Sequence, residues 1–232
     1  MKIELLVAAI ETTGPRGSAA LLRGLTVLGE EVLGDGVSHG VALHPALERM
    51  LRAAGVGARD LGLVVAGTGP GSFTGMRVGV GAARTLAFAA GCPVIGVPSF
   101  DALAAGAPPE ATAVACARDA RRGEAWFALY GPAGGDGSRA ALIPPCRKAA
   151  AAAAVSLPPG CIVLGDMATA VASLAAAPGI VADAESAPRA SLLARLGLAA
   201  FLRDGPPDPA TVLPLYLQEP LAVKKGEGVR GG

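Results

Sequence analysis

The alternation of apolar runs with helix-spaced apolar positions divides the chain into two α/β halves. Short apolar runs bounded by glycine or polar residues predict strands, and apolar positions that recur every three or four residues predict helices. In the first half these patterns predict three strands, a helix, a strand, a helix, a strand and a short helix. Their ranges are 5–10, 18–22, 25–32, 43–54, 61–66, 76–90, 93–97 and 100–105.

Local signals mark where these elements begin and end. Gly55 and Gly91 follow the two longer helices and are typical of helix stops. Ser99 is expected to cap the short helix. The pair Asp35-Gly36 breaks the pattern between the third strand and the first helix.

The second half begins after a predicted hinge at Ala107-Pro108-Pro109. We expect strands at 113–117, 125–130, 161–164 and 180–182, helices at 168–176 and 191–203, and a glycine-rich loop at 131–138. The alanine run 149–154 predicts the end of a helix that starts near Arg147, with a low-complexity loop as the alternative. The predicted domains are therefore 1–107 and 108–232.

Composition and charge narrow the function classes. The 20 Lys and Arg against 19 Asp and Glu give a net charge of +1, so no global field points to nucleic acid. The longest apolar runs, 5–10 and 149–155, are far shorter than the ~20 residues of a membrane span. Neither a secretory signal nor a C-x-x-C pair is recognised. We expect a cytoplasmic protein with reduced thiols and no membrane association.

The stretch 67–81, GTGPGSFTGMRVGVG, resembles a phosphate loop in composition but not in spacing. A Walker loop needs lysine after its last glycine, where this chain has Met76 and Arg77. The dinucleotide fingerprint G-x-G-x-x-G fails from both possible starting glycines. The nucleophile elbow G-x-S-x-G fails as well, because Gly71 directly precedes Ser72.

Two interpretations of this stretch remain open. Backbone N–H groups at a helix start near Thr74 could bind an anion. The helix also presents small residues at spacings of three and four, on which another element could pack closely, either within the monomer or from another subunit. The pattern favours packing over phosphate binding.

The stretch also resembles the signature of the TsaB family, G-x-GPGSFTG-x-R-x-G. The signature residues are Gly69, Pro70, Gly71, Ser72, Phe73, Thr74, Gly75 and Arg77. Weaker similarities occur, in the family's order, at 9–13 (AIETT), 39–51, 119–124 (DARRGE) and 215–217 (LYL). Together they cover most of the chain.

The resemblance implies two α/β subdomains of the actin, Hsp70 and sugar-kinase type, with the last long helix packing back on the first. It implies a non-catalytic scaffolding subunit of the complex that transfers a threonylcarbamoyl group to the adenosine next to the anticodon of tRNA. The implied partners are a TsaD-type catalytic subunit and a TsaE-type ATPase, with a homodimer when the chain is alone. ATP or ADP and a metal are expected on those partners, and no cofactor on this chain.

The resemblance further implies that pairing uses the two helices of the first half. The expected interface residues are Leu43, Leu47, Met50, Gly75, Met76, Gly79, Ala82, Ala83 and Leu86. Two departures from the family pattern are Glu11, in place of aspartate, and Gln218, in place of arginine. The longer Glu11 side chain argues against nucleotide chemistry.

Two other function classes are weighed against the scaffold. One is an autonomous actin-fold ATPase or kinase, and the other is a metallopeptidase of the glycoprotease type. His39 and His44 would point about 140° apart on a helix, which does not suit a shared metal. No spacing supports a triad of Ser72, His44 and Asp119. We therefore predict no catalytic residue and no metal ligand.

A charged turn is the last candidate site. Its residues are Arg118, Asp119, Arg121, Arg122 and Glu124. They form either a solvated hairpin tip or a contact to a partner or to tRNA. The basic tail residues Lys224, Lys225 and Arg230 raise the same question, and the last residues are expected to be mobile. Because stacking aromatics are not evident nearby, we expect tRNA contact only within the complex.

Overall fold

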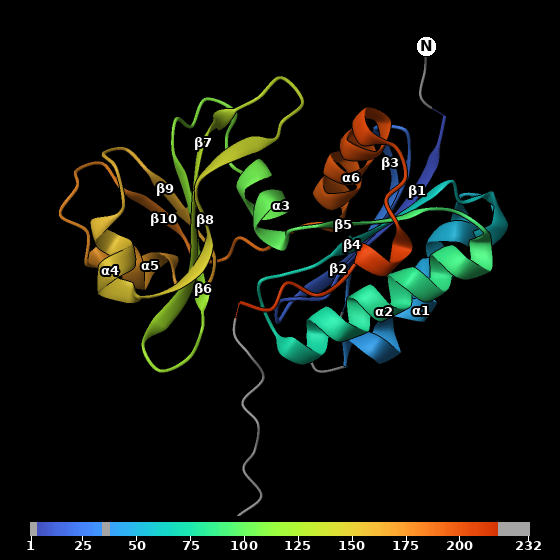
Figure 1. Ribbon diagram of the computed structural model, residues 1–232, viewed down its shortest axis with the longest axis horizontal. Coiled ribbons are helices and arrows are strands. Elements are labelled where there is room, and N and C mark those ends of the chain that lie inside the picture. Colours follow the sequence, from blue (N-terminus) through green and yellow to red (C-terminus); the bar gives the residue numbers. More distant parts are fainter. Residues whose placement is uncertain (1–3, 34–37, 218–232) are drawn as a thin grey trace, which may run out of the picture.

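Two five-stranded mixed sheets with the same strand order form the computed structural model, which describes residues 4–33 and 38–217 (Figure 1). The first sheet has the order β3(Thr26–Leu33), β2(Gly17–Arg23), β1(Leu6–Glu11), β4(Leu63–Gly67), β5(Val94–Val97). The second has the order β8(Arg139–Ala149), β7(Glu124–Ala133), β6(Val114–Asp119), β9(Ile162–Leu164), β10(Val181–Asp183). In both, the three strands that come first along the chain pair antiparallel and the last two pair parallel. The expected class of two α/β halves is confirmed.

Helices cover both faces of the first sheet. Helices α1(His39–Ala53) and α2(Phe73–Ala90) lie on one face, and α6(Ala190–Asp204) lies on the other (Figure 1). Every residue of β1 is buried, and its side chains alternate between the two layers. Ala8 and Ile10 belong to the core under α1 and α2, whereas Val7 and Ala9 belong to the core under α6.

Helix α6 comes from the second half of the sequence but packs against β1, β2, β4 and β5 of the first sheet. Gly197 allows this close approach, since a Cβ there would stand 2.6 Å from a methyl group of Val65. The implied return of the last long helix is confirmed. The limits 1–107 and 108–232 stay a prediction.

Shorter helices cover the second sheet. Helices α4(Ala150–Val155) and α5(Ala168–Ser173) pack on its outer face. Helix α3(Ser99–Ala105) lies between the two sheets (Figure 1), and Phe100 and Leu103 contact the core of the second sheet around Tyr130. Two short 3₁₀ turns complete the fold, η1(Ala58–Asp60) and η2(Pro209–Thr211).

The expected helix start near Arg147 is wrong. Arg147 and Ala149 pair with β7 as part of β8, and the helix begins only at Ala150. β8 could not be predicted from the sequence because it contains Pro144 and Pro145, and two consecutive prolines argue against a strand. The β7–β8 ladder tolerates them through several register shifts, and these strands also shorten the expected 131–138 loop.

Other predictions are corrected or lie outside the described residues. Pro98, rather than Ser99, occupies the cap position of α3. The expected break at Asp35-Gly36, Gln218 and the basic tail lie outside the described residues. Among the described helices, none is long and apolar enough to cross a membrane.

Candidate functional site

The glycine-rich stretch packs against the first strand of its own sheet. A Cβ at Gly75 would overlap the carbonyl oxygen of Thr12, and one at Gly79 would overlap the Thr12 hydroxyl. That hydroxyl donates a 2.7 Å hydrogen bond to the carbonyl oxygen of Gly75. The small residues of α2 therefore allow the helix to lie directly on the end of β1.

Most of the expected pairing residues are buried within the single chain. Leu43, Leu47, Met50, Met76 and Ala83 are buried in the monomer core, as are both glycines of α2 named above. Most of them belong to the core of the first sheet, and their part in pairing stays a prediction. Ala82 and Leu86 are half-buried, and their part in pairing stays a prediction.

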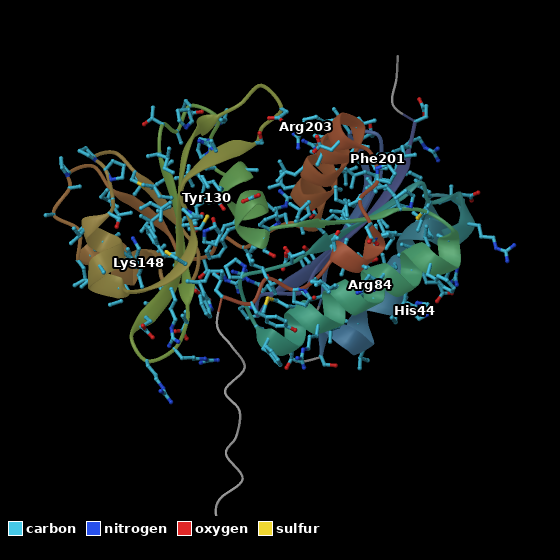
Figure 2. All side chains as sticks on the ribbon, viewed as in Figure 1. His44, Arg84, Tyr130, Lys148, Phe201 and Arg203 are labelled. Atoms are coloured by element: carbon cyan, nitrogen blue, oxygen red, sulfur yellow. The ribbon has the colours of Figure 1, made fainter. Side chains whose placement is uncertain are left out.

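The opposite sides of α1 and α2 are exposed. We call this surface the outer helix face and define it by Val41, His44, Gly81, Thr85 and Phe88. Phe88 is 91% exposed and Val41 is 65% exposed. His44 on α1 and Arg84 on α2 are labelled in Figure 2. Exposed apolar side chains on two adjacent helices are typical of an interaction surface.

Glu11 ties the end of β1 to α3. It is fully buried, and its Oε1 accepts a 2.6 Å hydrogen bond from the Thr13 amide. Its Oε2 accepts a 2.7 Å hydrogen bond from the Ser99 hydroxyl. A Cβ at Gly67 would overlap this carboxylate. Glu11 thus has a clear internal role at the centre of the first half.

The residues considered for catalysis do not contact one another in the hydrogen bonds of the described residues, although Ser72, Asp119 and His39 border one cavity and only His44 lies elsewhere. Ser72 caps α2 and its hydroxyl accepts a 3.2 Å hydrogen bond from the Gly75 amide. Asp119 accepts a 2.7 Å hydrogen bond from the Arg121 amide, and His44 is exposed on α1. His39 lies with Nδ1 3.3 Å from the carbonyl oxygen of Thr12. Within residues 4–33 and 38–217, no three His, Cys, Asp or Glu side chains cluster as metal ligands would.

The charged turn is divided between the surface and the interior. Arg121 and Arg122 are exposed at its tip, with φ angles of 69° and 59°. Glu124 forms an ion pair with Arg147. Arg118 is only 7% exposed, so the expectation of a wholly solvated tip is wrong for this residue.

A cavity of about 680 Å³ lies between the two halves, and we call it the cleft cavity. The β1–β2 loop (13–15), the start of α2 (71–74) and the charged turn (118–121) line it. His39, Trp126 and Asp166 complete the lining. The structure therefore joins three separate sequence candidates at one place.

Tyr216 is a residue of this region that sequence reasoning did not place. Its ring lies 5.3 Å from that of Phe73 at the start of α2. Arg77 donates a 2.9 Å hydrogen bond to the Tyr216 hydroxyl, and its guanidinium stands 3.9 Å from the centre of the Phe73 ring. The tail motif and the glycine-rich signature thus form one structural unit.

Two of the four free cysteines are buried in the core of the second half. Cys116 and Cys161 are fully buried, and burial raises the pKa of both thiols, that of Cys161 to about 11. Thiols with raised pKa values are poor nucleophiles at neutral pH. These two cysteines are structural.

Comparisons with known proteins agree with this architecture. Residues 36–163, more than half of the chain, match the family model described as tRNA N6-adenosine threonylcarbamoyltransferase (TsaD). An uncharacterized protein of Mycobacterium tuberculosis is 40% identical over 126 residues, 53% of this chain and 58% of that protein. The tRNA threonylcarbamoyladenosine biosynthesis protein TsaB of Bacillus subtilis is 35% identical over 126 residues, 54% of this chain and 55% of its own length. The chain thus spans a little over half the length of these curated relatives.

A solved structure covers more of the chain. The structure titled YeaZ from Pseudomonas aeruginosa has a TM-score of 0.81 and 28% identity, over 92% of this chain and 100% of that chain. The range matched by the family model includes the signature at residues 67–79. The chain belongs to the TsaB/YeaZ family of tRNA threonylcarbamoyladenosine biosynthesis proteins.

Proposed function

We propose that this chain is a non-catalytic scaffolding subunit of the complex that transfers a threonylcarbamoyl group to the adenosine next to the anticodon of tRNA. Its TsaB relatives are named for the biosynthesis of this modification. In this proposal the chain holds a TsaD-type catalytic subunit in its working arrangement. A TsaE-type ATPase completes the assembly, and tRNA contacts this chain only within it.

The exposed outer helix face is the observation that carries the proposal. Phe88 and Val41 project from α2 and α1 with little of their surface covered, while the inner sides of both helices are filled by the sheet. Burying apolar surface of this kind favours association by about 25 cal/mol per Å² before the costs of binding are counted. The same face serves for a homodimer when the catalytic subunit is absent.

The catalytic chemistry is proposed to reside on the partner subunits. The carboxylate of Glu11 accepts hydrogen bonds from Thr13 and Ser99 rather than standing free at the cleft. ATP or ADP and the metal are accordingly expected on the partners, with no cofactor on this chain.

Gly79 and Gly81 offer a matched pair of variants for the test. Arginine at Gly79 would overlap Thr12 and disturb the monomer, so loss of pairing there would not test the interface. Gly81 lies on the outer helix face, and a Cβ there meets nothing within 4 Å. Gly81→Arg should therefore keep the fold and obstruct pairing. Leu202→Arg, at an exposed position on α6, is the control.

The measurement is co-purification with a tagged catalytic subunit. We expect wild type and Leu202→Arg to be retained equally, and Gly81→Arg to be lost although its circular dichroism spectrum is unchanged. Equal retention of folded Gly81→Arg would refute pairing through the outer helix face.

A further inference from the structure

We propose that the outer helix face selects an acidic partner surface, because the arginines of α2 attract carboxylates on the catalytic subunit and repel a second copy of this chain. This inference rests on the proposed scaffolding function and deepens it. It states which chemistry makes the face prefer the catalytic subunit to self-pairing. The apolar side chains of the face attract either partner, and its charges decide between them.

A row of four residues runs along the exposed side of α2. Arg77, Gly81, Arg84 and Phe88 follow one another at spacings of four, three and four, so they lie on one side of the helix. All four are exposed. Gly81 leaves room in the middle of the row, since a Cβ there meets nothing within 4 Å. A partner that approaches at Gly81 therefore stands within about 6 Å of both arginines along the helix axis.

Neither arginine of this row forms an ion pair with a carboxylate of the described residues. Arg77 donates a 2.9 Å hydrogen bond to the Tyr216 hydroxyl, and its guanidinium stands 3.9 Å from the centre of the Phe73 ring. Both of these groups are uncharged, so they leave the positive charge of Arg77 in place. Arg84 is exposed on the same side of the helix (Figure 2).

Helix α1 does not supply a free carboxylate to balance these charges. Its one acidic residue, Glu48, forms an ion pair with Arg52. Its other arginine, Arg49, pairs with Glu31 on β3. Because α2 has no acidic residue, the two helices together carry four arginines and one glutamate. The outer sides of α1 and α2 therefore carry a net positive charge.

A twofold pair of this chain would bring these like charges together. In such a pair the same surface faces itself, so the arginines of one α2 approach an α2 that has arginines and no carboxylate. Repulsion between exposed charges acts over about 10 Å at 0.1 M ionic strength. Phe88 and Val41 offer apolar contact to either partner. The same arginines thus weaken the homodimer and strengthen a complex with an acidic partner.

Salt should act in opposite directions on the two kinds of pair. Sedimentation velocity measures self-association of the full chain, and calorimetry measures its binding to the purified catalytic subunit. Raising NaCl from about 0.1 M to about 0.5 M screens exposed charges. We expect this change to tighten the homodimer about threefold or more and to weaken the catalytic complex about threefold or more.

Variants of Arg84 separate charge from shape. Arg84→Gln removes the charge and keeps a good helix former. It should tighten the homodimer and weaken the catalytic complex, each by about threefold or more. Arg84→Lys keeps the charge and should bind as wild type does in both assays. Arg195→Gln is the matched control, since Arg195 is exposed on α6 at the other face of the first sheet, and it should change neither affinity.

Three results would overturn this inference alone. These are effects of Arg84→Gln that have the same sign in both assays, affinities of folded Arg84→Gln equal to those of wild type, or equal effects of Arg195→Gln. Each of them leaves the scaffolding function standing, because the catalytic subunit still binds. Failure of the wild-type chain to bind the catalytic subunit at either salt concentration would instead overturn the scaffolding function, and this inference with it.

Discussion

The two halves share one strand order but differ in the helices that cover them. The helices on the first sheet have 15, 18 and 15 residues, whereas α4 and α5 on the second have six residues each. The long helices on the first sheet leave an outer side that a partner can cover. This difference is consistent with our proposal that pairing uses the first half, while the second half lines the far side of the cleft cavity.

The corresponding hairpins of the two halves also differ in chemistry. The β1–β2 loop brings small residues, such as Gly14, close to the cleft cavity. The β6–β7 hairpin occupies the same place in the second sheet and brings Arg118 and Arg121. The first half therefore borders the cleft cavity with small residues, and the second half borders it with charged side chains.

The largest expected effect tests the inner side of α2. Gly79→Arg should destabilise the protein by more than about 4 kcal/mol, because its side chain must displace the end of β1. Gly81→Arg should instead be neutral or stabilising by up to about 1 kcal/mol, since glycine is a poor helix former. Urea denaturation of both variants measures the difference. Similar stabilities would contradict the assignment of inner and outer sides.

A smaller effect tests how α6 is fixed to the first sheet. Glu30 on β3 accepts hydrogen bonds from the Ser191 amide and hydroxyl at the start of α6, and it pairs with Arg189. Glu30→Ala should lower the free energy of unfolding by about 1–3 kcal/mol, because it removes charge-assisted hydrogen bonds at the start of α6. The same denaturation assay applies, and an unchanged midpoint would show that α6 is held by its apolar core alone.

The contact between α3 and the second sheet predicts a dependence on pH. Burial raises the pKa of Asp101 above its ordinary 3.8, although Tyr130 donates it a 2.7 Å hydrogen bond that acts in the opposite direction. Folded Asp101 then retains its proton to higher pH than unfolded Asp101, so its contribution to stability falls as pH rises above 3.8. Asp101→Asn keeps an acceptor for Tyr130 and should gain stability relative to wild type as pH rises from about 3 to 7. Thermal melts of wild type and Asp101→Asn, run side by side from about pH 3 to 7, measure this change. A difference in melting temperature between the two proteins that stays constant across the range would disprove the prediction.

The smallest expected effect concerns an exposed link between the halves. Arg16 and Glu185 form a 2.8 Å ion pair with both side chains largely in solvent. Glu185→Gln should lower the free energy of unfolding by less than about 1 kcal/mol. The loss should be smaller still at high salt, because salt screens exposed ion pairs. A larger loss in urea denaturation would mean that surface charges, rather than the packing of α3 and α6, join the halves.

Much of the fold could be predicted from local patterns, whereas β8 could not. The runs that became β1, β4 and β5 are apolar except for Glu11 at the end of β1, and Gly91 ends α2 with φ at 72° as expected of a helix stop. β8 contains two prolines and lies on a sheet edge, where tertiary pairing overrides local preference.

The site was harder to predict because its parts are distant in sequence. The spacing of Gly75 and Gly79 correctly indicated a close approach, but it could not specify whether a sheet or another subunit would approach. Arg118 reaches Thr13, and Arg77 reaches Tyr216, only through the fold. The sequence did not identify Arg118 as buried, because the other charged residues of the turn, such as Arg121 and Arg122, are exposed.

The measurement that tests the central claim most directly is threonylcarbamoyl transfer to unmodified tRNA in a reconstituted assay. It combines a catalytic subunit, the ATPase and increasing amounts of this chain. Our account predicts little transfer without the chain, saturation at one chain per catalytic subunit or a fixed multiple of it, and a much higher requirement for Gly81→Arg than for wild type. Full transfer without the chain, or an identical requirement for folded Gly81→Arg, would contradict a scaffold that acts through the outer helix face.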